Sequence, residues 1–232
     1  MKPLRVLSLR HQLGLAAGLA ALAMSGLVLA HPQPWAWELA LTRQVQGWTW
    51  LHGPLQAISW PGNDVLRQGL LMLVVCSLLA RHGWRREART LAVAGSGAFL
   101  LNLGLKALVA RARPAADAVQ LYVTANGWSF PSGHVMFYTA FYGGLGGFAC
   151  RKLPPGSRRT VILSLCAILV GLVGLSRIFL GAHWLLDVVA GYGFGLAWLL
   201  AVGAPLWQAD GLASPAAHTT PSAAPRQVEH HG

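Results

Sequence analysis

The chain has 232 residues, of which 54% are hydrophobic and 11% are charged. Soluble domains carry about a quarter charged residues, so this composition excludes an ordinary soluble enzyme and is typical of a membrane protein. The net charge of +11 does not indicate a nucleic-acid partner, because the basic residues fall in short clusters between apolar runs and not along one polar face.

Six apolar runs in chain order are candidates for membrane-spanning helices, which need roughly 17 to 25 residues each. They cover residues 13–30, 65–80, 91–110, 135–150, 161–175 and 184–207. The second, fourth and fifth runs are short, so we expect their helices to extend into flanking residues. The sequence therefore predicts an all-α integral membrane protein, a six-helix bundle, with its domain at residues 1–210. The tail, 211–232, is rich in Ala, Pro, Ser, Thr and His and is predicted to be disordered.

The first run has an alternative interpretation as a signal peptide. It follows Lys2, Arg5 and Arg10 and ends in Val28-Leu29-Ala30, which resembles a cleavage site. Its apolar core is longer than the about 7 to 15 residues usual for signal peptides, so we predict a retained helix.

The basic residues orient the helices, because cytoplasmic loops carry an excess of Lys and Arg. With both termini in the cytoplasm, 12 of the 18 basic residues lie on the inner side. The outer side then holds Arg43, Arg67, Lys106, Arg111, Arg113 and Arg177. The last four lie near polar motifs, which suggests one cationic site on the outer face.

The tryptophans have a structural interpretation. Five tryptophans crowd the outer segment before the second apolar run, where they predict an interfacial aromatic belt. They are Trp35, Trp37, Trp48, Trp50 and Trp60.

The three cysteines, Cys76, Cys150 and Cys166, are odd in number and lack metal-ligand spacing, so neither a disulfide nor a zinc site is expected.

The first polar motif is KALVARARP, at the outer end of the third run. Lys106 and Arg113 are seven residues apart, which places them on one face if the helix continues to Pro114. Snorkelling membrane anchors are the alternative. Anchors should favour the inner side, however, and Lys106 lies inside the apolar run.

The second motif is SFPSGHV, at the start of the fourth run. Pro131 suits a first helical position, and the backbone N–H groups at Ser132 and Gly133 then form an anion site at a helix N-terminus. The Ser132 hydroxyl adds a donor. His134 is either a satisfied interfacial residue or an acid placed beside a bound phosphate.

The third motif is SRIFLGAHWLLD, between the last two runs. His183 and Asp187 are spaced i,i+4, so on one helix the carboxylate accepts the Nδ1 proton and leaves Nε2 free. Arg177 offers a fork for phosphate oxygens. A structural His–Asp pair is the alternative, but it does not explain why all three motifs fall on the same face of the membrane.

Together these motifs resemble the three signatures of the type 2 phosphatidic acid phosphatase superfamily, KxxxxxxRP, PSGH and SRxxxxxHxxxD. The resemblance extends from the third apolar run to the sixth. It implies that His183 is the nucleophile, that Asp187 supports it and that His134 is the general acid. It further implies that the phosphate is bound by Lys106, Arg113, Ser132, Gly133 and Arg177. No metal or cofactor is expected, because these side chains supply the positive charge.

The resemblance leads us to expect a lipid phosphate phosphatase in the bacterial inner membrane, with its active site facing the periplasm. The loop 115–128, with Asp117, Tyr122, Asn126 and Trp128, is expected to contribute to headgroup choice. Undecaprenyl diphosphate, phosphatidylglycerophosphate, phosphatidate and lipid A phosphates remain open as substrates, as does the oligomeric state. A lipid phosphotransferase and an anion transporter are alternatives. A vanadium haloperoxidase shares the motifs, but those enzymes are soluble.

Overall fold

The structure, a computed structural model, describes residues 8–209 and contains helices and loops but no strand within that range. The predicted all-α class is confirmed, whereas the predicted tail 211–232 lies outside the described residues. The long helices are α1 (Leu9–Ala30), α4 (Val65–Arg81), α5 (Arg85–Val109), α6 (Gly133–Lys152), α7 (Ser157–Phe179) and α8 (Leu185–Ala209). Each coincides with one of the six apolar runs, and α6 and α7 extend beyond their runs as expected.

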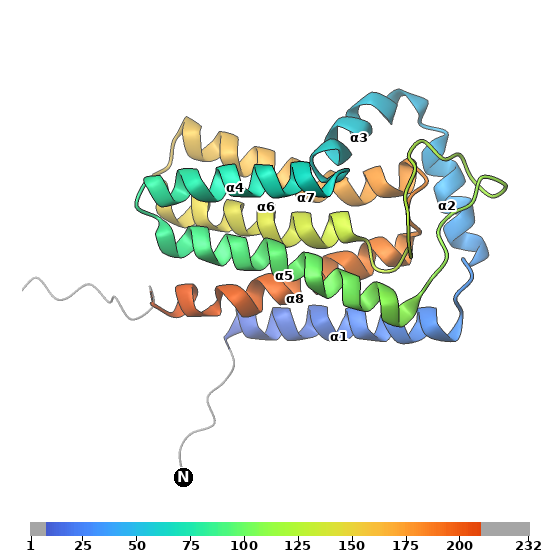
Figure 1. Cartoon of the computed structure of the whole chain (residues 1–232), viewed down its shortest axis with the longest axis horizontal. Coiled ribbons are helices and arrows are strands. Elements are labelled where there is room, and N and C mark those ends of the chain that lie inside the picture. Colours follow the sequence, from blue (N-terminus) through green and yellow to red (C-terminus); the bar gives the residue numbers. More distant parts are fainter. Residues whose placement is uncertain (1–7, 210–232) are drawn as a thin grey trace, which may run out of the picture.

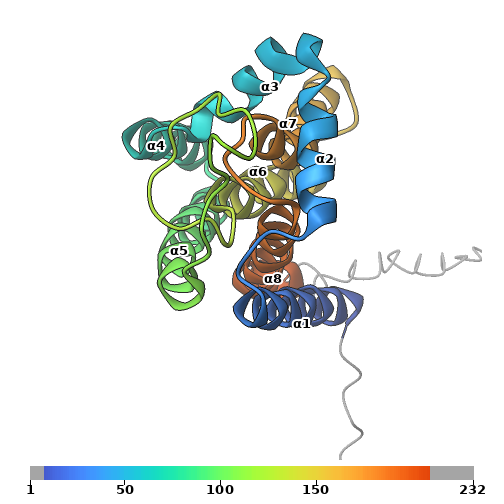
Figure 2. The same cartoon turned by 90° about the vertical axis from the view of Figure 1, so that its right-hand side faces the viewer.

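The six long helices lie side by side, with α6 and α8 in the middle of the bundle (Figures 1 and 2). Helix α6 packs against α5, α7 and α8, and α8 also packs against α1. The interior of the bundle is aromatic around α6, where Phe137, Tyr138 and Phe141 are buried. The other long helices keep many leucines exposed, as lipid-facing surfaces do.

Four of the described helices, α1, α5, α7 and α8, are long and apolar enough to cross a membrane. A fifth candidate span is the pair 49–62 and α4, which is bent by 74° at a short break. The protein is therefore a multi-pass membrane protein.

Two short helices cross one end of the bundle, where the sequence analysis expected only a tryptophan-rich segment. They are α2 (Ala36–Gln46) and α3 (His52–Ser59), and the one-turn 3-10 helices η1 (Thr49–Leu51) and η2 (Trp60–Gly62) flank α3. Helix α2 covers the end of the bundle at the right of Figure 1. Its Glu38 accepts a hydrogen bond from the backbone N–H of Trp35, which caps the first turn.

The end of α5 corrects one prediction. The helix stops at Val109 and does not continue to Pro114, because Ala110 adopts a left-handed conformation with φ of 48°. The chain leaves the helix axis there, so Arg113 belongs to the following loop and not to the helical face that carries Lys106. The predicted continuous helix from Lys106 to Pro114 is therefore wrong. The two side chains still line the same cavity, as described below, but their seven-residue spacing is not the reason.

Close packing positions the second and third motifs against each other. A Cβ atom at Gly191 of α8 would lie 3.0 Å from the backbone oxygen of Ser132, so α8 approaches the start of α6 without an intervening side chain. The Ser132 N–H donates to the backbone oxygen of Asp187 over 2.9 Å. The turn before α6 and the first turn of α8 are therefore fixed relative to each other.

Candidate active site

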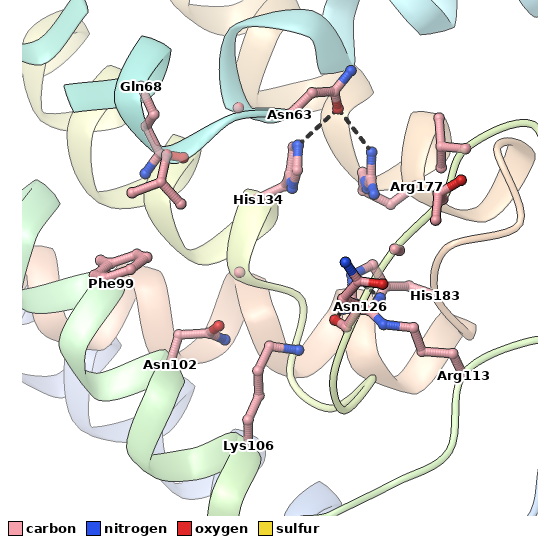
Figure 3. Close-up of a pocket in the computed structure, with 16 residues that line it drawn as sticks. Asn63, Gln68, Phe99, Asn102, Lys106, Arg113, Asn126, His134, Arg177 and His183 are labelled. Carbon is pink, nitrogen blue, oxygen red and sulfur yellow. Dashed lines mark hydrogen bonds between the residues drawn. The ribbon is translucent and has the colours of Figure 1, made fainter. Parts of the chain in front are cut away.

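A cavity of about 570 Å³ opens at the end of the bundle that α2 and α3 cover, and the three motifs meet there. Six of the eight predicted site residues line it, as Figure 3 shows for most of them. These six are Lys106, Arg113, Gly133, His134, Arg177 and His183. The other two, Ser132 and Asp187, are buried behind the cavity wall.

Three cations face the cavity, each from a different element. Lys106 of α5 donates to the backbone oxygens of Trp128 and Ser129. Arg113 of the following loop donates to backbone oxygens at residues 126, 127 and 182. Arg177, in the last turn of α7, donates to the hydroxyl of Ser59 over 2.5 Å.

All three cations donate to neutral oxygens, and no carboxylate among residues 8–209 forms a salt bridge with any of them. Their three positive charges therefore exceed the negative charge of the nearby carboxylates, and the cavity favours an anion.

Two polar atoms beside the cavity are buried and have no hydrogen-bond partner within the described structure. They are the hydroxyl oxygen of Ser132 and Nε of Arg177. Buried donors are nearly always paired in folded proteins, so such atoms call for a ligand. Ser132 is the N-cap of α6, which begins at Gly133. Pro131 therefore lies before the helix and not at its first position as predicted, but the N-terminus of α6 does meet the cavity, because Gly133 lines it.

Gly133 is required at its position by close contact with α5. A Cβ atom there would lie 2.7 Å from Oδ1 of Asn102, a buried side chain one turn before Lys106. The glycine thus lets the start of α6 sit directly on α5, beside the ammonium group of Lys106.

The tautomer of His183 follows from its neighbour Arg113. Nη1 of Arg113 lies 3.3 Å from Nε2 of His183. Because a guanidinium only donates, Nε2 must be the acceptor, and the ring proton is on Nδ1. Burial, followed by the charges of Arg113, Lys106 and Arg177, lowers the pKa of His183 well below its usual value of 6.5. The imidazole is therefore neutral, with a lone pair on the nitrogen that faces the cavity.

Asp187 lies behind His183, but the predicted direct hydrogen bond is absent. Helix α8 begins at Leu185, so the two residues do not share a helix, and Nδ1 of His183 is 3.6 Å from Oδ2 of Asp187. The hydroxyl of Ser129 contacts both groups. It donates to Oδ2 of Asp187 over 2.5 Å and is 3.4 Å from Nδ1 of His183. The histidine and the carboxylate are thus connected both by their own 3.6 Å contact and through Ser129.

His134, in the first turn of α6, is held by Asn63. Oδ1 of Asn63 lies 3.1 Å from Nε2 of His134 and 3.3 Å from Nη1 of Arg177 (Figure 3). Because the arginine only donates, the side chain of Asn63 must present its oxygen to both groups. Nε2 of His134 is therefore protonated.

Sequence reasoning missed three residues around the site and misplaced a fourth. Ser129 lies within the quoted SFPSGHV motif, but nothing in its spacing indicated contact with Asp187. Asn63 and Glu38 lie in the segment taken as an aromatic belt. Arg111 was expected in the cationic site, but it is fully buried and does not line the cavity. Of the predicted headgroup residues, Asn126 lines the cavity, whereas Asp117, Tyr122 and Trp128 do not.

The helical bundle and its lining cations define a multi-pass membrane protein with a cationic cavity at one end. Residues 87–209, more than half of the chain, match the model of the PAP2 superfamily, and the chain belongs to this superfamily. The predicted resemblance is therefore confirmed.

Two curated relatives and one solved structure place the chain within the superfamily. It is 37% identical over 98 residues to phosphatidylglycerophosphatase B of Bacillus subtilis, covering 42% of this chain and 47% of the relative. It is 35% identical over 126 residues to decaprenylphosphoryl-5-phosphoribose phosphatase of Mycobacterium tuberculosis, covering 53% of this chain and 64% of the relative. The matches thus span about half to two-thirds of these relatives.

The fold is similar to the crystal structure of a transmembrane PAP2-type phosphatidylglycerolphosphate phosphatase from Bacillus subtilis. The TM-score is 0.68 and the identity 21%, and the match covers 87% of this chain and 98% of that one. This similarity confirms the transmembrane PAP2 fold.

Proposed function

We propose that this protein is a membrane-embedded phosphatase that hydrolyses lipid phosphate monoesters or diphosphates through a phosphohistidine at His183. The observation that carries the proposal is the set of three cations without carboxylate partners around two imidazoles. This arrangement fits a phosphoryl group, whose transition state spreads negative charge over its three equatorial oxygens. The lipid phosphatases among the relatives support the same reaction.

The phosphate is bound by the cavity cations and by the start of α6. Lys106, Arg113 and Arg177 neutralise its oxygens, and the hydroxyl of Ser132 and the N–H of Gly133 donate to them. The unpartnered Oγ of Ser132 and Nε of Arg177 gain acceptors when the phosphate enters. These donors are preorganised before the reaction, which is the arrangement that stabilises a charged transition state best.

His183 attacks the phosphorus atom through Nε2, the nitrogen that faces the cavity. The new bond joins Nε2 to phosphorus, and the bond between phosphorus and the leaving oxygen breaks. The imidazole becomes a cation in this step, and the buried carboxylate of Asp187 stabilises it, directly and through Ser129.

His134 transfers the protons of both half-reactions. The negative charge of the bound phosphate favours the imidazolium form of His134, with a proton on each ring nitrogen. Its Nε2 proton, held by Asn63 in the unliganded site, passes to the leaving oxygen in the first step and leaves the imidazole neutral. The neutral imidazole then accepts a proton from a water molecule, whose oxygen attacks phosphorus. The bond between Nε2 of His183 and phosphorus breaks, inorganic phosphate is released and both histidines return to their initial state.

A lipid substrate fits because apolar side chains line part of the cavity. Val65 of α4 and Phe99 of α5 are among the lining residues, and Figure 3 shows Phe99 across the cavity from Arg113 and His183. A phosphate at His183 therefore leaves its lipid tail to extend between α4 and α5, while Asn126 and its neighbours contact the headgroup.

For the topology, we propose six spans, α1 and α4 to α8, in one catalytic domain at residues 1–210. Both termini are in the cytoplasm and the cavity faces the periplasm, with the protein in the inner membrane. The clustering of basic residues at the opposite end of the bundle from the cavity supports this orientation.

The test is phosphate release by the purified protein in detergent from a panel of lipid phosphates. The panel contains phosphatidylglycerophosphate, undecaprenyl diphosphate, phosphatidate and a lipid A phosphate, each with and without an added alcohol acceptor. Phosphate release without acceptor supports hydrolysis. A phosphorylated alcohol with no free phosphate identifies a phosphotransferase and contradicts the proposal, as does inactivity towards the whole panel.

A further inference from the structure

A buried ion-pair network lies on the far side of Asp187 from the cavity. Arg111 is completely buried and contacts two buried carboxylates. Its Nη2 is 2.6 Å from Oε2 of Glu38, and its Nη1 is 2.7 Å from Oδ1 of Asp187. Glu38 comes from α2, Arg111 from the loop after α5 and Asp187 from α8, so the network ties three separate elements together. We call Glu38 and Arg111 the clamp.

The clamp determines which oxygen of Asp187 faces the histidine. Oδ1 is taken by Arg111. Oδ2 accepts from the backbone N–H of Trp184 over 2.9 Å and from the hydroxyl of Ser129, which lies next to Nδ1 of His183. With Oδ1 fixed by a guanidinium, the carboxylate cannot rotate away from Ser129 without breaking a charge-assisted hydrogen bond.

Glu38 also fixes the element that carries Asp187. Its Oε1 accepts from the backbone N–H of Leu186 over 3.0 Å, so α2 binds the first turn of α8 directly. The residue thus holds Asp187 both through Arg111 and through the backbone of α8.

The charges of Glu38 and Arg111 cancel each other. The negative charge of Asp187 therefore stays available to stabilise an imidazolium at His183. Arg111 alone would neutralise Asp187, leaving little negative charge to stabilise an imidazolium at His183. Glu38 balances Arg111, so the three buried groups keep one net negative charge next to the nucleophile. The other charged groups facing His183 are the cations Lys106, Arg113 and Arg177, which belong to the phosphate site.

We propose that Glu38 and Arg111 are positioning residues for phosphoryl transfer, acting through Asp187 on His183. The inference rests on the proposed function, because it assigns the clamp a role in the same reaction. Neither residue lines the cavity, so neither contacts the substrate. Their effect should appear in the rate of the chemical step and not in phosphate binding.

The experiment compares Glu38→Gln and Arg111→Lys with the wild-type protein and with Glu87→Gln. Glu38→Gln keeps the size and an acceptor oxygen but removes the charge that balances Arg111. Arg111→Lys keeps the charge but loses the planar fork that reaches both carboxylates. Glu87 is the matched control, since it is a buried carboxylate paired with Lys152 over 3.0 Å, distant in sequence from the three motifs and not lining the cavity. For each variant we measure kcat with a lipid phosphate per folded molecule, and the inhibition constant of inorganic phosphate.

We expect both clamp variants to lose about 10²-fold in kcat, the usual effect of displacing a catalytic group by about 1 Å. The inhibition constant of phosphate should be unchanged, because the three cavity cations are intact, and Glu87→Gln should match the wild type in both measurements.

Wild-type kcat in either clamp variant would overturn the inference while leaving the proposed function intact. Equal losses of kcat and phosphate binding would also overturn it, since they indicate a general collapse of the site. If one variant fails to fold, the other decides. An inactive wild-type protein would instead count against the proposed function.

Discussion

Nη1 of Arg113 lies 3.3 Å from Nε2 of His183, so the arginine proposed to bind phosphate also fixes the tautomer of the proposed nucleophile. Before substrate enters, the guanidinium occupies the lone pair of Nε2 and keeps the ring proton on Nδ1. In the proposed mechanism, a bound phosphate competes for the same guanidinium and frees that lone pair for attack. One side chain would thus both prepare the histidine and bind the substrate.

This relationship predicts the pH dependence of the reaction. The imidazole is nucleophilic only when neutral, at pH values above its pKa, and burial with the nearby cations lowers that pKa well below 6.5. The acid limb of kcat/KM should therefore lie below pH 6.5. Arg113→Gln removes one of the lowering charges, so it should move the acid limb to higher pH as well as weaken binding. The measurement is the pH profile of kcat/KM with p-nitrophenyl phosphate as substrate. Ionisation of the substrate is the same for every variant, so a shift of the acid limb between variants reports on the enzyme.

Arg43→Gln is the control for this profile, because Arg43 is an exposed cation of α2 that does not line the cavity. Its profile should match that of the wild type. An acid limb that stays in place or moves to lower pH in Arg113→Gln would contradict the role given to Arg113.

Removal of His134 should affect substrates according to their leaving groups. Without its acid, His134→Ala should lose about 10² to 10⁴-fold with a lipid phosphate, whose alkoxide leaves poorly. The loss should be much smaller with p-nitrophenyl phosphate, because p-nitrophenolate needs no proton to leave. His82→Ala, an exposed histidine in the loop between α4 and α5, is the control. Equal losses on both substrates would remove the case for His134 as the leaving-group acid.

Ser132→Ala should lower activity without lowering the stability of the protein. The hydroxyl is buried without a partner in the unliganded protein, so its removal should not lower the free energy of unfolding. Loss of its hydrogen bond to a charged phosphate should lower kcat/KM by the equivalent of about 1.5 to 3 kcal/mol. Thr139→Val is the matched control, since the Thr139 hydroxyl is also buried and unpartnered but lies seven residues further along α6, about two turns from the helix N-terminus. An equal loss of activity in both variants would argue against a phosphate contact.

The topology is tested by labelling single cysteines in intact cells, after Cys76, Cys150 and Cys166 have been replaced. Ala116 lies in the loop after α5 and Ser157 begins α7 at the other end of the bundle, and both are exposed. An impermeant thiol reagent should label a cysteine at position 116 and leave one at position 157 unlabelled. The reverse pattern would place the cavity in the cytoplasm.

The long helices and most of the site were predictable because both depend on local patterns. Apolar runs long enough to span a bilayer gave the six long helices, and the three motifs brought six of eight predicted residues to one cavity. The positions of the site residues relative to the helix ends were less predictable. Ala110 ends α5 in a left-handed turn, and His183 precedes α8, because tertiary contacts and not residue spacing fix these two positions.

The supporting residues were not predictable for a related reason. Glu38, Asn63 and Ser129 act through contacts with residues between 54 and 148 positions away, such as Ser129 with His183 and Glu38 with Leu186. No periodicity or spacing in one sequence encodes such pairs. Arg111 was expected to join the cationic site because of its charge, but Glu38 and Asp187 hold it on the opposite side of the carboxylate.

The central claim is that the phosphoryl group passes through His183. The most direct test is acid-free quenching of the protein during turnover of a ³²P-labelled lipid phosphate, followed by mapping of the labelled peptide. We predict labelled phosphohistidine at position 183 in the wild type and in Asp187→Asn, and none in His183→Ala, which should also release no phosphate. Label that persists in folded His183→Ala, or turnover by that variant, would contradict the account.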